Sequence, residues 1–318
     1  MSSPTTARRL TRNDLDAVVA IDAALVGQPR GEFFQRRLAS ALAVPELHAQ
    51  FGVDAADGSG LAGFVLARVL AGEFGRPDPA LRLQAIGVRK DVQGQGVGRA
   101  LMEALEAAAR KFGATVLRTT AAWNDHQMLA FLDHEGFTLA DNQVIDCKVH
   151  MGRLTPPSES DDDDDDGDTL ERDLADVRTL TRDDLPAIVR IDAKLTGRER
   201  SDYIRRKVED ALGDSDIAIS LVAREDNHAI GFLTARVDLG DSGRTAPVAV
   251  IDTIGVDPGY AKQGVGSALL SQLFGNLSSL RVERIETIIS RSDFALLGFL
   301  YRVGFAPSQR LAFLKRLA

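Results

Sequence analysis

The sequence is poor in cysteine and contains no long apolar run. Cys147 is the single cysteine among 318 residues, so the chain cannot form an internal disulfide, which fits a reducing compartment. No apolar run approaches the roughly 18 residues of a membrane-spanning helix, and the first ten residues lack the apolar segment of a secretory signal. We therefore expect a cytoplasmic protein without a membrane partner.

An excess of positive charge is also missing. The formal net charge is −8, and residues 155–173 hold ten acidic residues against one arginine, so the rest of the chain is close to neutral. A nucleic-acid-binding face needs concentrated lysine and arginine. We therefore expect no nucleic-acid partner.

The acidic segment divides the chain. Residues 155–173 include six consecutive aspartates and almost no apolar surface to bury, which predicts a disordered linker. A second interpretation is a calcium loop, because Asp162, Asp164, Asp166, Gly167 and Asp173 match EF-hand positions 1, 3, 5, 6 and 12. The proline-containing stretch before it cannot form the first helix of an EF-hand, so we expect a plain linker and no metal site.

The two flanking segments are copies of each other. Residues 10–27 (LTRNDLDAVVAIDAALVG) match residues 180–197 (LTRDDLPAIVRIDAKLTG), and residues 62–69 match residues 230–237. We predict two domains, residues 1–154 and 174–318, joined by the linker at 155–173.

Each copy predicts the same elements in the same order. Thr11 and Thr181 are expected to cap a first helix, and a second helix follows near residues 33–42 and 203–212. Three strands, a helix, a strand, a helix and a final strand complete each half. Asn124 or Asp125 is expected to cap the last helix of the first half. The pattern predicts an α/β fold with a mixed sheet flanked by helices.

A glycine-rich turn joins a strand to a helix in both halves, as VQGQGVGRAL (92–101) and AKQGVGSALL (261–270). The first turn of a helix has free backbone N–H groups and partial positive charge, and glycine lets an anion approach them. The turn therefore predicts a phosphate site, with a plain turn as the alternative. It is neither a dinucleotide fingerprint, because Arg99 replaces the third glycine, nor a P-loop.

The spacing Gln93-x-x-Gly96-x-Gly98, with Val88 five residues earlier, resembles the pyrophosphate loop of the GNAT superfamily of acyl-CoA N-acyltransferases. The resemblance covers nearly all of both halves. It implies two tandem GNAT-like domains, each with a mixed, splayed β-sheet flanked by helices. It also implies that acyl-CoA binds between the splayed strands, with its pyrophosphate on the loop amides. The binding residues implied are Val88, Gln93, Gly94, Gly96, Val97, Gly98 and Arg99 in the first half, and Val256, Lys262, Gly264, Val265, Gly266 and Ser267 in the second.

The resemblance further implies a base for the amine and a tyrosine that protonates the thiolate. Asp252 lies four residues before Val256, whereas Gln84, which cannot act as a base, takes that place in the first half. Leu132 and Leu300 occupy the usual tyrosine position, and Tyr301 is one residue further. We expect Asp252 and Tyr301 to be catalytic and the second half to be the active one. Ordinary structural roles for both residues are the alternative.

The resemblance thus predicts an N-acetyltransferase that moves an acetyl group from acetyl-CoA to a primary amine of a small molecule, peptide or protein. The alternative is a non-catalytic acyl-CoA sensor or scaffold. Basic residues at 36–37 and 205–207 either attract an acidic acceptor or form a solvated helix face. We expect a monomer with paired domains or a homodimer.

Overall fold

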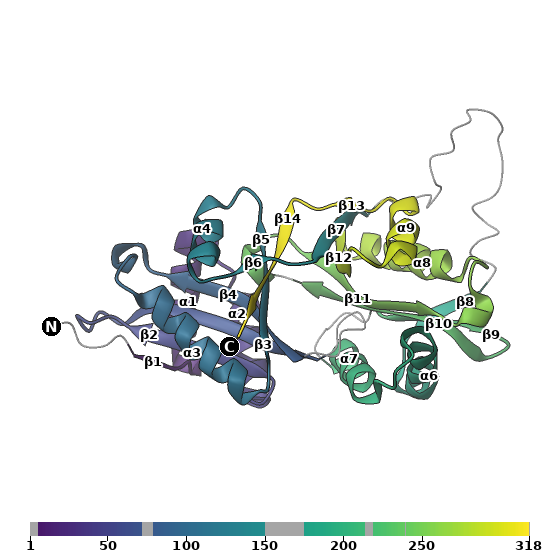
Figure 1. The fold of residues 1–318 in the computed structure, drawn as a ribbon, viewed down its shortest axis with the longest axis horizontal. Helices are drawn as coiled ribbons and strands as arrows, with labels where there is room; N and C mark the ends of the chain where they lie inside the picture. Colours follow the sequence, from purple (N-terminus) through teal and green to yellow (C-terminus); the bar gives the residue numbers. More distant parts are fainter. Residues whose placement is uncertain (1–5, 72–78, 150–174, 214–218, 239, 318) are drawn as a thin grey trace, which may run out of the picture.

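The computed structural model describes residues 6–71, 79–149, 175–213, 219–238 and 240–317. The acidic linker and its calcium-loop alternative lie outside this part of the chain. Figure 1 shows two similar α/β halves, each with a twisted sheet flanked by helices.

The first half follows the predicted order, with short additional strands. Its elements are β1 (Ala7–Arg9), α1 (Leu15–Val26), α2 (Gly31–Ala43), β2 (His48–Asp54), β3 (Leu61–Ala71), β4 (Pro79–Val88), α3 (Val97–Lys111), β5 (Val116–Ala122), α4 (His126–His134), β6 (Thr138–Leu139) and β7 (Asn142–Lys148).

The second half repeats this order. Its elements are β8 (Asp176–Thr179), α6 (Leu185–Thr196), α7 (Ser201–Gly213), β9 (Leu221–Glu225), β10 (His228–Asp238), β11 (Val248–Val256), α8 (Val265–Ser279), β12 (Arg284–Ser290), α9 (Phe294–Arg302), β13 (Ala306–Pro307) and β14 (Arg310–Arg316). Short 3-10 turns precede or connect several of these, including η3 (Lys90–Val92) and η5 (Asp241–Gly243).

The start of each half is capped as the sequence predicts. The Asp14 carboxylate accepts hydrogen bonds from the backbone N and the hydroxyl of Thr11 at 2.7 and 2.9 Å. Asp184 and Thr181 repeat the arrangement at 2.8 Å for both contacts. A capping box therefore opens each first helix, through one 3-10 turn.

The last long strands of the two halves are exchanged. The first sheet has the order β1-β2-β3-β4-β5-β14-β6, and the second has the order β13-β7-β12-β11-β10-β9-β8. β14 pairs antiparallel with β5 over residues 310–316, and β7 pairs antiparallel with β12 over residues 142–148. In Figure 1 the yellow β14 lies beside β5 and β6, and the teal β7 lies beside β12. Each sheet is therefore completed by a strand from the other half.

The helix that follows each glycine turn packs tightly on the sheet. Val97, Leu101, Met102 and Leu105 of α3 are buried against β2, β3 and β4. A Cβ built on Gly63 of β3 would lie 2.8 Å from Val97 Cγ1. This close contact fixes the N-terminus of α3 over the sheet, just after the glycine turn that follows β4.

Candidate functional site

The cleft of the first half begins where β4 and β5 separate. The two strands pair in parallel only between residues 80–82 and 116–118. Gln84 has no partner in the register of β3, which shifts there between Leu66 and Ala67, so it forms a β-bulge. The Thr119 hydroxyl donates to the Leu83 carbonyl at 3.1 Å at this point. Beyond it the strands diverge and leave unpaired backbone between them.

The glycine turn closes the outer end of this cleft. Gly94 and Gly96 have left-handed backbones, with φ of 75° and 84°, and Gly96 is the N-cap of α3. A Cβ on either glycine would meet no atom within 4 Å, so the turn has an open concave side. The Gln93 side chain donates to the Val88 carbonyl at 3.1 Å and accepts from Gln127 at 3.0 Å. These bonds tie the turn to the end of β4 and to α4.

A cavity of about 600 Å³ joins the diverging strands to the glycine turn. All seven residues that the sequence names in the first half line it: Val88, Gln93, Gly94, Gly96, Val97, Gly98 and Arg99. One end presents the free backbone N–H groups of α3, and the walls include apolar side chains such as Leu25 and Phe131. A ligand with an anionic group at the helix N-terminus and an uncharged arm along the apolar walls would fit this cavity.

The second half has the same backbone arrangement. β11 and β12 pair in parallel only at residues 249–250 and 285–286, and Asp252 is the residue left out of the register with β10. Gly264 caps α8 with φ of 78°. Lys262 adopts φ of 62°, which is unusual for a residue with a side chain, at the place of Gly94. Val256 ends β11, and Val265, Gly266 and Ser267 form the first turn of α8.

Asp252 is buried between cations. Its carboxylate lies 3.6 Å from Lys207 Nζ and 3.6 Å from Arg236 Nε, and the residue is 8 % exposed. Burial alone would raise the pKa of Asp252, but Arg236 and Lys207 outweigh it and lower that pKa below its ordinary value. A carboxylate with a lowered pKa is a weaker base, so these surroundings do not favour proton abstraction by Asp252.

Tyr301 is 41 % exposed on α9, and its hydroxyl accepts a hydrogen bond from Gln143 Nε2 at 2.8 Å. Counted back from the Gly-Phe that ends each last helix, Tyr301 corresponds to Asp133. Phe131, His134 and Glu135 line the first cavity, and Asp133 is not among its lining residues. Leu132 and Leu300, at the usual tyrosine position, are fully buried. The Tyr301 hydroxyl therefore contacts β7, the exchanged strand, through Gln143.

The predicted cap of the last helix is confirmed, and the basic helix residues divide into two kinds. Asp125 Oδ1 accepts from the Met128 backbone N at 3.1 Å. Arg36 and Arg205 pair with acidic residues of their own exposed helix faces. Lys207 instead lies beside Asp252, and Arg37 reaches Asp241 of the second half at 3.4 Å. The interpretation as a solvated helix face therefore holds for only some of the basic residues at 36–37 and 205–207.

Sequence reasoning missed the residues that the second half brings to the first cavity. Ser242 and Gly243, which follow β10, line this cavity together with Gln84 and Thr120. Gln84 Nε2 donates to Asp241 at 3.2 Å. Burial would raise the pKa of Asp241, but Arg37 and Arg82 hold it well below its usual value. No local pattern in the sequence signals a contact between residues about 157 positions apart.

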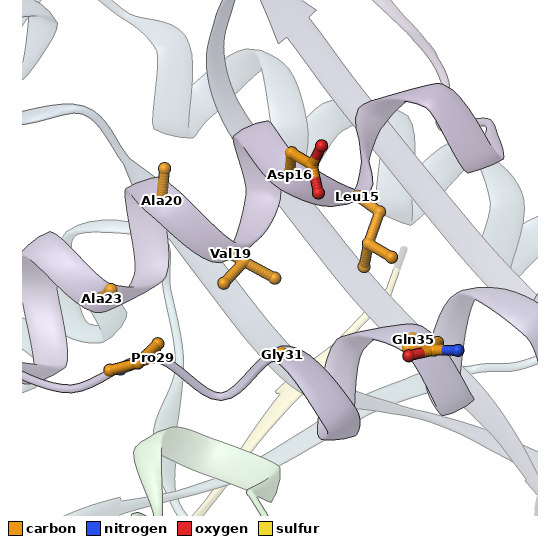
Figure 2. A pocket seen from close by; sticks show the side chains of 8 residues that line it. All are labelled: Leu15, Asp16, Val19, Ala20, Ala23, Pro29, Gly31 and Gln35. Atoms are coloured by element: carbon orange, nitrogen blue, oxygen red, sulfur yellow. The ribbon is translucent and has the colours of Figure 1, made fainter.

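A second hollow lies on the outside of the first half, between α1 and α2 (Figure 2). Its volume is about 410 Å³, and one of its lining residues, Asp16, is ionisable. This hollow does not combine a helix N-terminus, diverging strands and buried polar groups, as the cleft does. Its lining residues are Leu15, Asp16, Val19, Ala20, Ala23, Pro29, Gly31 and Gln35.

No group of three or more histidine, cysteine or acidic side chains is placed to hold a metal ion among the residues that the structure describes. No helix within the described ranges combines the length and the apolar character needed to cross a membrane.

Comparison with known proteins supports the resemblance. The model of the Acetyltransferase (GNAT) family matches residues 23–137 and 177–305, together more than half of the chain. No curated protein sequence matches it.

Solved structures share the whole fold at low sequence identity. A tandem GNAT protein from the clavulanic acid biosynthesis pathway superposes with a TM-score of 0.64 at 16% identity, over 98% of both chains. N-myristoyltransferase from Saccharomyces cerevisiae, solved with bound myristoyl-CoA, gives 0.60 at 12% identity, over 99% of this chain and 80% of that one.

A GCN5-related glucosamine N-acetyltransferase region in a fungal multi-domain GH3 β-N-acetylglucosaminidase gives a TM-score of 0.67 at 17% identity. The match covers 98% of this chain but only 38% of that protein, so this chain spans less than half of its length. At these identities the likenesses show the fold alone.

Proposed function

Because the chain belongs to the GNAT family of acetyltransferases, we propose that it transfers an acetyl group from acetyl-CoA to a primary amine. The observation that carries this proposal is the first cavity, where diverging strands, the glycine turn and the N-terminus of α3 meet. The amine attacks the thioester carbonyl, a C–N bond forms, and the C–S bond breaks to release CoA.

The chain's own residues would hold the donor along the length of the cleft. The N-terminal turn of α3, with Gly94, Gly96, Val97 and Gly98 lining the cavity, suits the pyrophosphate. The unpaired edge of β4 between Leu83 and Val88 offers backbone groups to the amides of the pantetheine arm. The second half repeats these features from Val256 to Ser267, and we propose that it too binds acyl-CoA.

Proton transfer distinguishes the two halves. An alkyl ammonium must lose a proton before attack, since its ordinary pKa is about 10.4. The family resemblance predicts that Asp252 accepts the proton of the amine and that Tyr301 protonates the thiolate. Both roles remain predictions. In the first cleft Gln84 takes the place of Asp252 and cannot accept a proton. If the first half is the active one, its proton acceptor is a group other than Gln84, and the candidates are solvent and the cavity-lining side chains of His134 and Glu135.

A matched pair of glycine variants tests donor binding. Gly96 and Gly264 cap equivalent helices with φ of 84° and 78°, so alanine imposes a similar backbone cost at both, about 1–2 kcal/mol. Gly96→Ala also places a methyl group on the open side of the first turn. We expect at least tenfold weaker acetyl-CoA binding to the first site by titration calorimetry, with this site unaffected by Gly264→Ala. Unchanged binding in Gly96→Ala would contradict the proposed site.

A non-catalytic acyl-CoA sensor is the second candidate. It is favoured by the buried leucines at both tyrosine positions and by the ion-paired state of Asp252. Release of free CoA from acetyl-CoA, measured across a panel of amines, peptides and proteins, separates the two functions. The enzyme releases CoA with at least one amine, and the alanine variant in the active half, Gly96→Ala or Gly264→Ala, lowers that rate. A sensor binds acetyl-CoA and releases none above the rate with water.

A further inference from the structure

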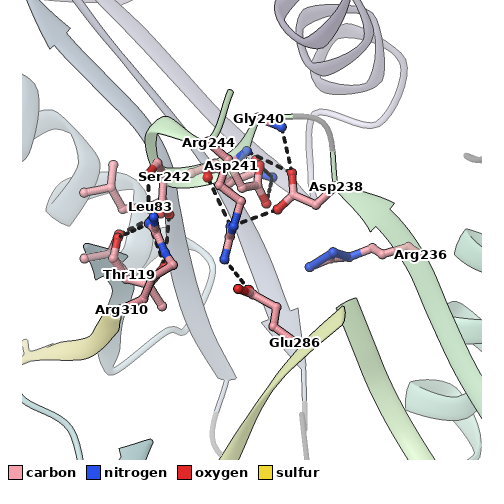
Figure 3. Close-up of polar contacts among 12 residues, drawn as sticks. Leu83, Thr119, Arg236, Asp238, Gly240, Asp241, Ser242, Arg244, Glu286 and Arg310 are labelled. Carbon is pink, nitrogen blue, oxygen red and sulfur yellow. Dashed lines mark hydrogen bonds and ion pairs between the residues drawn. The ribbon is translucent and has the colours of Figure 1, made fainter. Parts of the chain in front are cut away.

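A turn of the second half closes the inner end of the first cavity. The turn comprises residues 240–244 and contains η5, which packs between β4 and β5. Ser242 and Gly243 line the cavity beside Leu83, Gln84 and Thr120, where the strands begin to separate. Figure 3 shows Ser242 close to Leu83, Thr119 and Arg310. The glycine turn follows the C-terminal end of β4 at Val88, about five residues or roughly 17 Å from Leu83 along the strand.

Contacts from the first sheet hold this turn in place. Arg310 of the exchanged strand β14 donates to the Ser242 carbonyl at 2.8 Å, and the Thr120 hydroxyl lies 3.3 Å from that of Ser242. The buried Arg30 donates to the carbonyls of Gly240 and Arg244. Together with the bond from Gln84 to the Asp241 carboxylate, these contacts hold the turn on both sides of Ser242.

The second half holds the same turn from behind. The Asp238 carboxylate accepts from the backbone N of Gly240 and of Asp241 at 3.0 and 2.8 Å. Arg244 links Asp238, at 3.1 Å, to Glu286 of β12 (Figure 3). Both Asp238 and Glu286 are fully buried. The turn is therefore a fixed wall, unlike an exposed loop that an incoming ligand could displace.

Ser242 itself is in an unfavourable backbone conformation. Its φ of 55° and ψ of 42° are left-handed, and a serine there costs energy that glycine would not. Such strain persists only where the surroundings impose it, and it concentrates at functional sites. Ser242 thus places a side chain at the closed end of the cavity, although its left-handed backbone conformation favours glycine.

We infer that the turn at residues 240–244 limits the acyl group of the donor to a short chain, with Ser242 as the residue that determines this specificity. The inference rests on the proposed function, in which acyl-CoA lies in the first cleft with its thioester toward the strand separation. A two- or three-carbon acyl group ends before the turn, whereas each further carbon meets Ser242 and its supporting hydrogen bonds. The second half thereby selects the donor of the first.

The experiment measures the dissociation constants of CoA, acetyl-CoA, propionyl-CoA and octanoyl-CoA for the full chain by calorimetry, and repeats them with Ser242→Gly. Glycine suits the left-handed backbone, so this variant keeps the turn folded while removing the side chain. Ser59→Gly, in the exposed turn at residues 58–60, is the control. Gly96→Ala identifies the part of the binding heat that comes from the first cleft, because this variant should weaken binding there.

We expect octanoyl-CoA to bind the wild-type first cleft at least tenfold more weakly than acetyl-CoA. Ser242→Gly should reduce this ratio at least threefold while leaving CoA and acetyl-CoA unchanged, and Ser59→Gly should alter nothing. Equal binding of octanoyl-CoA and acetyl-CoA by the wild type, or an unchanged ratio in Ser242→Gly, would overturn the inference alone. Failure of CoA itself to bind, or binding insensitive to Gly96→Ala, would overturn the proposed function and this inference with it.

Discussion

Asp252 and Gln84 occupy the same β-bulge in the two copies, yet their surroundings differ. Asp252 is paired with Lys207 and Arg236, whereas Gln84 donates to Asp241 of the other half. Both side chains therefore take part in buried polar networks. A buried carboxylate that pairs with two partly buried cations has a structural role that its position on the strand does not reveal.

We predict that Asp252→Asn destabilises the fold, because it leaves Lys207 and Arg236 without their shared anion. Breaking a buried ion pair from one side typically costs about 3–5 kcal/mol. The folded pKa of Asp252 lies below its ordinary value of 3.8, so its carboxylate stabilises the fold above about pH 4. This stabilisation is lost as the pH falls through the folded pKa. The difference in unfolding free energy between wild type and variant is full at pH 7 and shrinks below pH 4.

Urea denaturation at several pH values measures this difference. Asp202→Asn, at a side chain that is 83% exposed, is the control, with an expected change of at most about 1 kcal/mol. A catalytic base gives the opposite result. In that case Asp252→Asn retains stability and loses about 10²–10⁴-fold in kcat.

The helices after the glycine turns depend on small residues in the neighbouring strands. Gly63 and Gly231 are equivalent, and a Cβ on each would approach Val97 and Val265 to within 2.8 and 2.9 Å. On Gly63 it would also lie 2.9 Å from the Gly87 carbonyl, which belongs to the backbone and cannot rotate away. The position of α3, and with it that of the glycine turn, therefore depends on the absence of a side chain at Gly63.

Gly63→Ala should destabilise the protein by about 1–3 kcal/mol, the usual cost of overpacking a core. Gly275, on the exposed side of α8, is the matched comparison, because its Cβ would meet no atom within 4 Å. Gly275→Ala should stabilise by about 0.5–1 kcal/mol through helix propensity. Thermal unfolding of both variants tests the pair, and a stabilised Gly63→Ala would disprove the close packing.

At the scale of elements, much of the structure followed from local sequence. Thr11, Asp125 and the two glycine turns sit where capping and backbone rules predict them, because their signals lie within a few residues. The seven residues named for the first cleft line one cavity for the same reason. Ser242 and Asp241 could not be assigned to it, since their neighbours come from the other half and depend on tertiary contacts alone.

The exchange of β7 and β14 joins the two halves into one unit. Each exchanged strand pairs along seven residues with its neighbour in the other sheet. The duplication was readable from the sequence, but β7 and β14 take equivalent places in their halves, and pairing with the other half's sheet depends on tertiary contacts. Which sheet each one joins is therefore not encoded in its own pattern.

We predict that cutting the chain between the halves will not separate them. A specific protease site placed within residues 155–173 of the full chain would give two fragments held by both exchanged strands. They should elute together in size-exclusion chromatography and part only in denaturant. Two separately eluting, folded fragments under native conditions would contradict the exchange.

The exchange also constrains synthesis of the protein on the ribosome. β5 ends at Ala122, but its partner β14 begins at Arg310, about 190 residues later. At roughly 5–20 residues per second this is a wait of about 9–38 s. During that time the nascent first sheet carries an unsatisfied strand edge, which is a hazard for aggregation. The sheet beside the cleft of the first half is thus completed only after β14 has been translated.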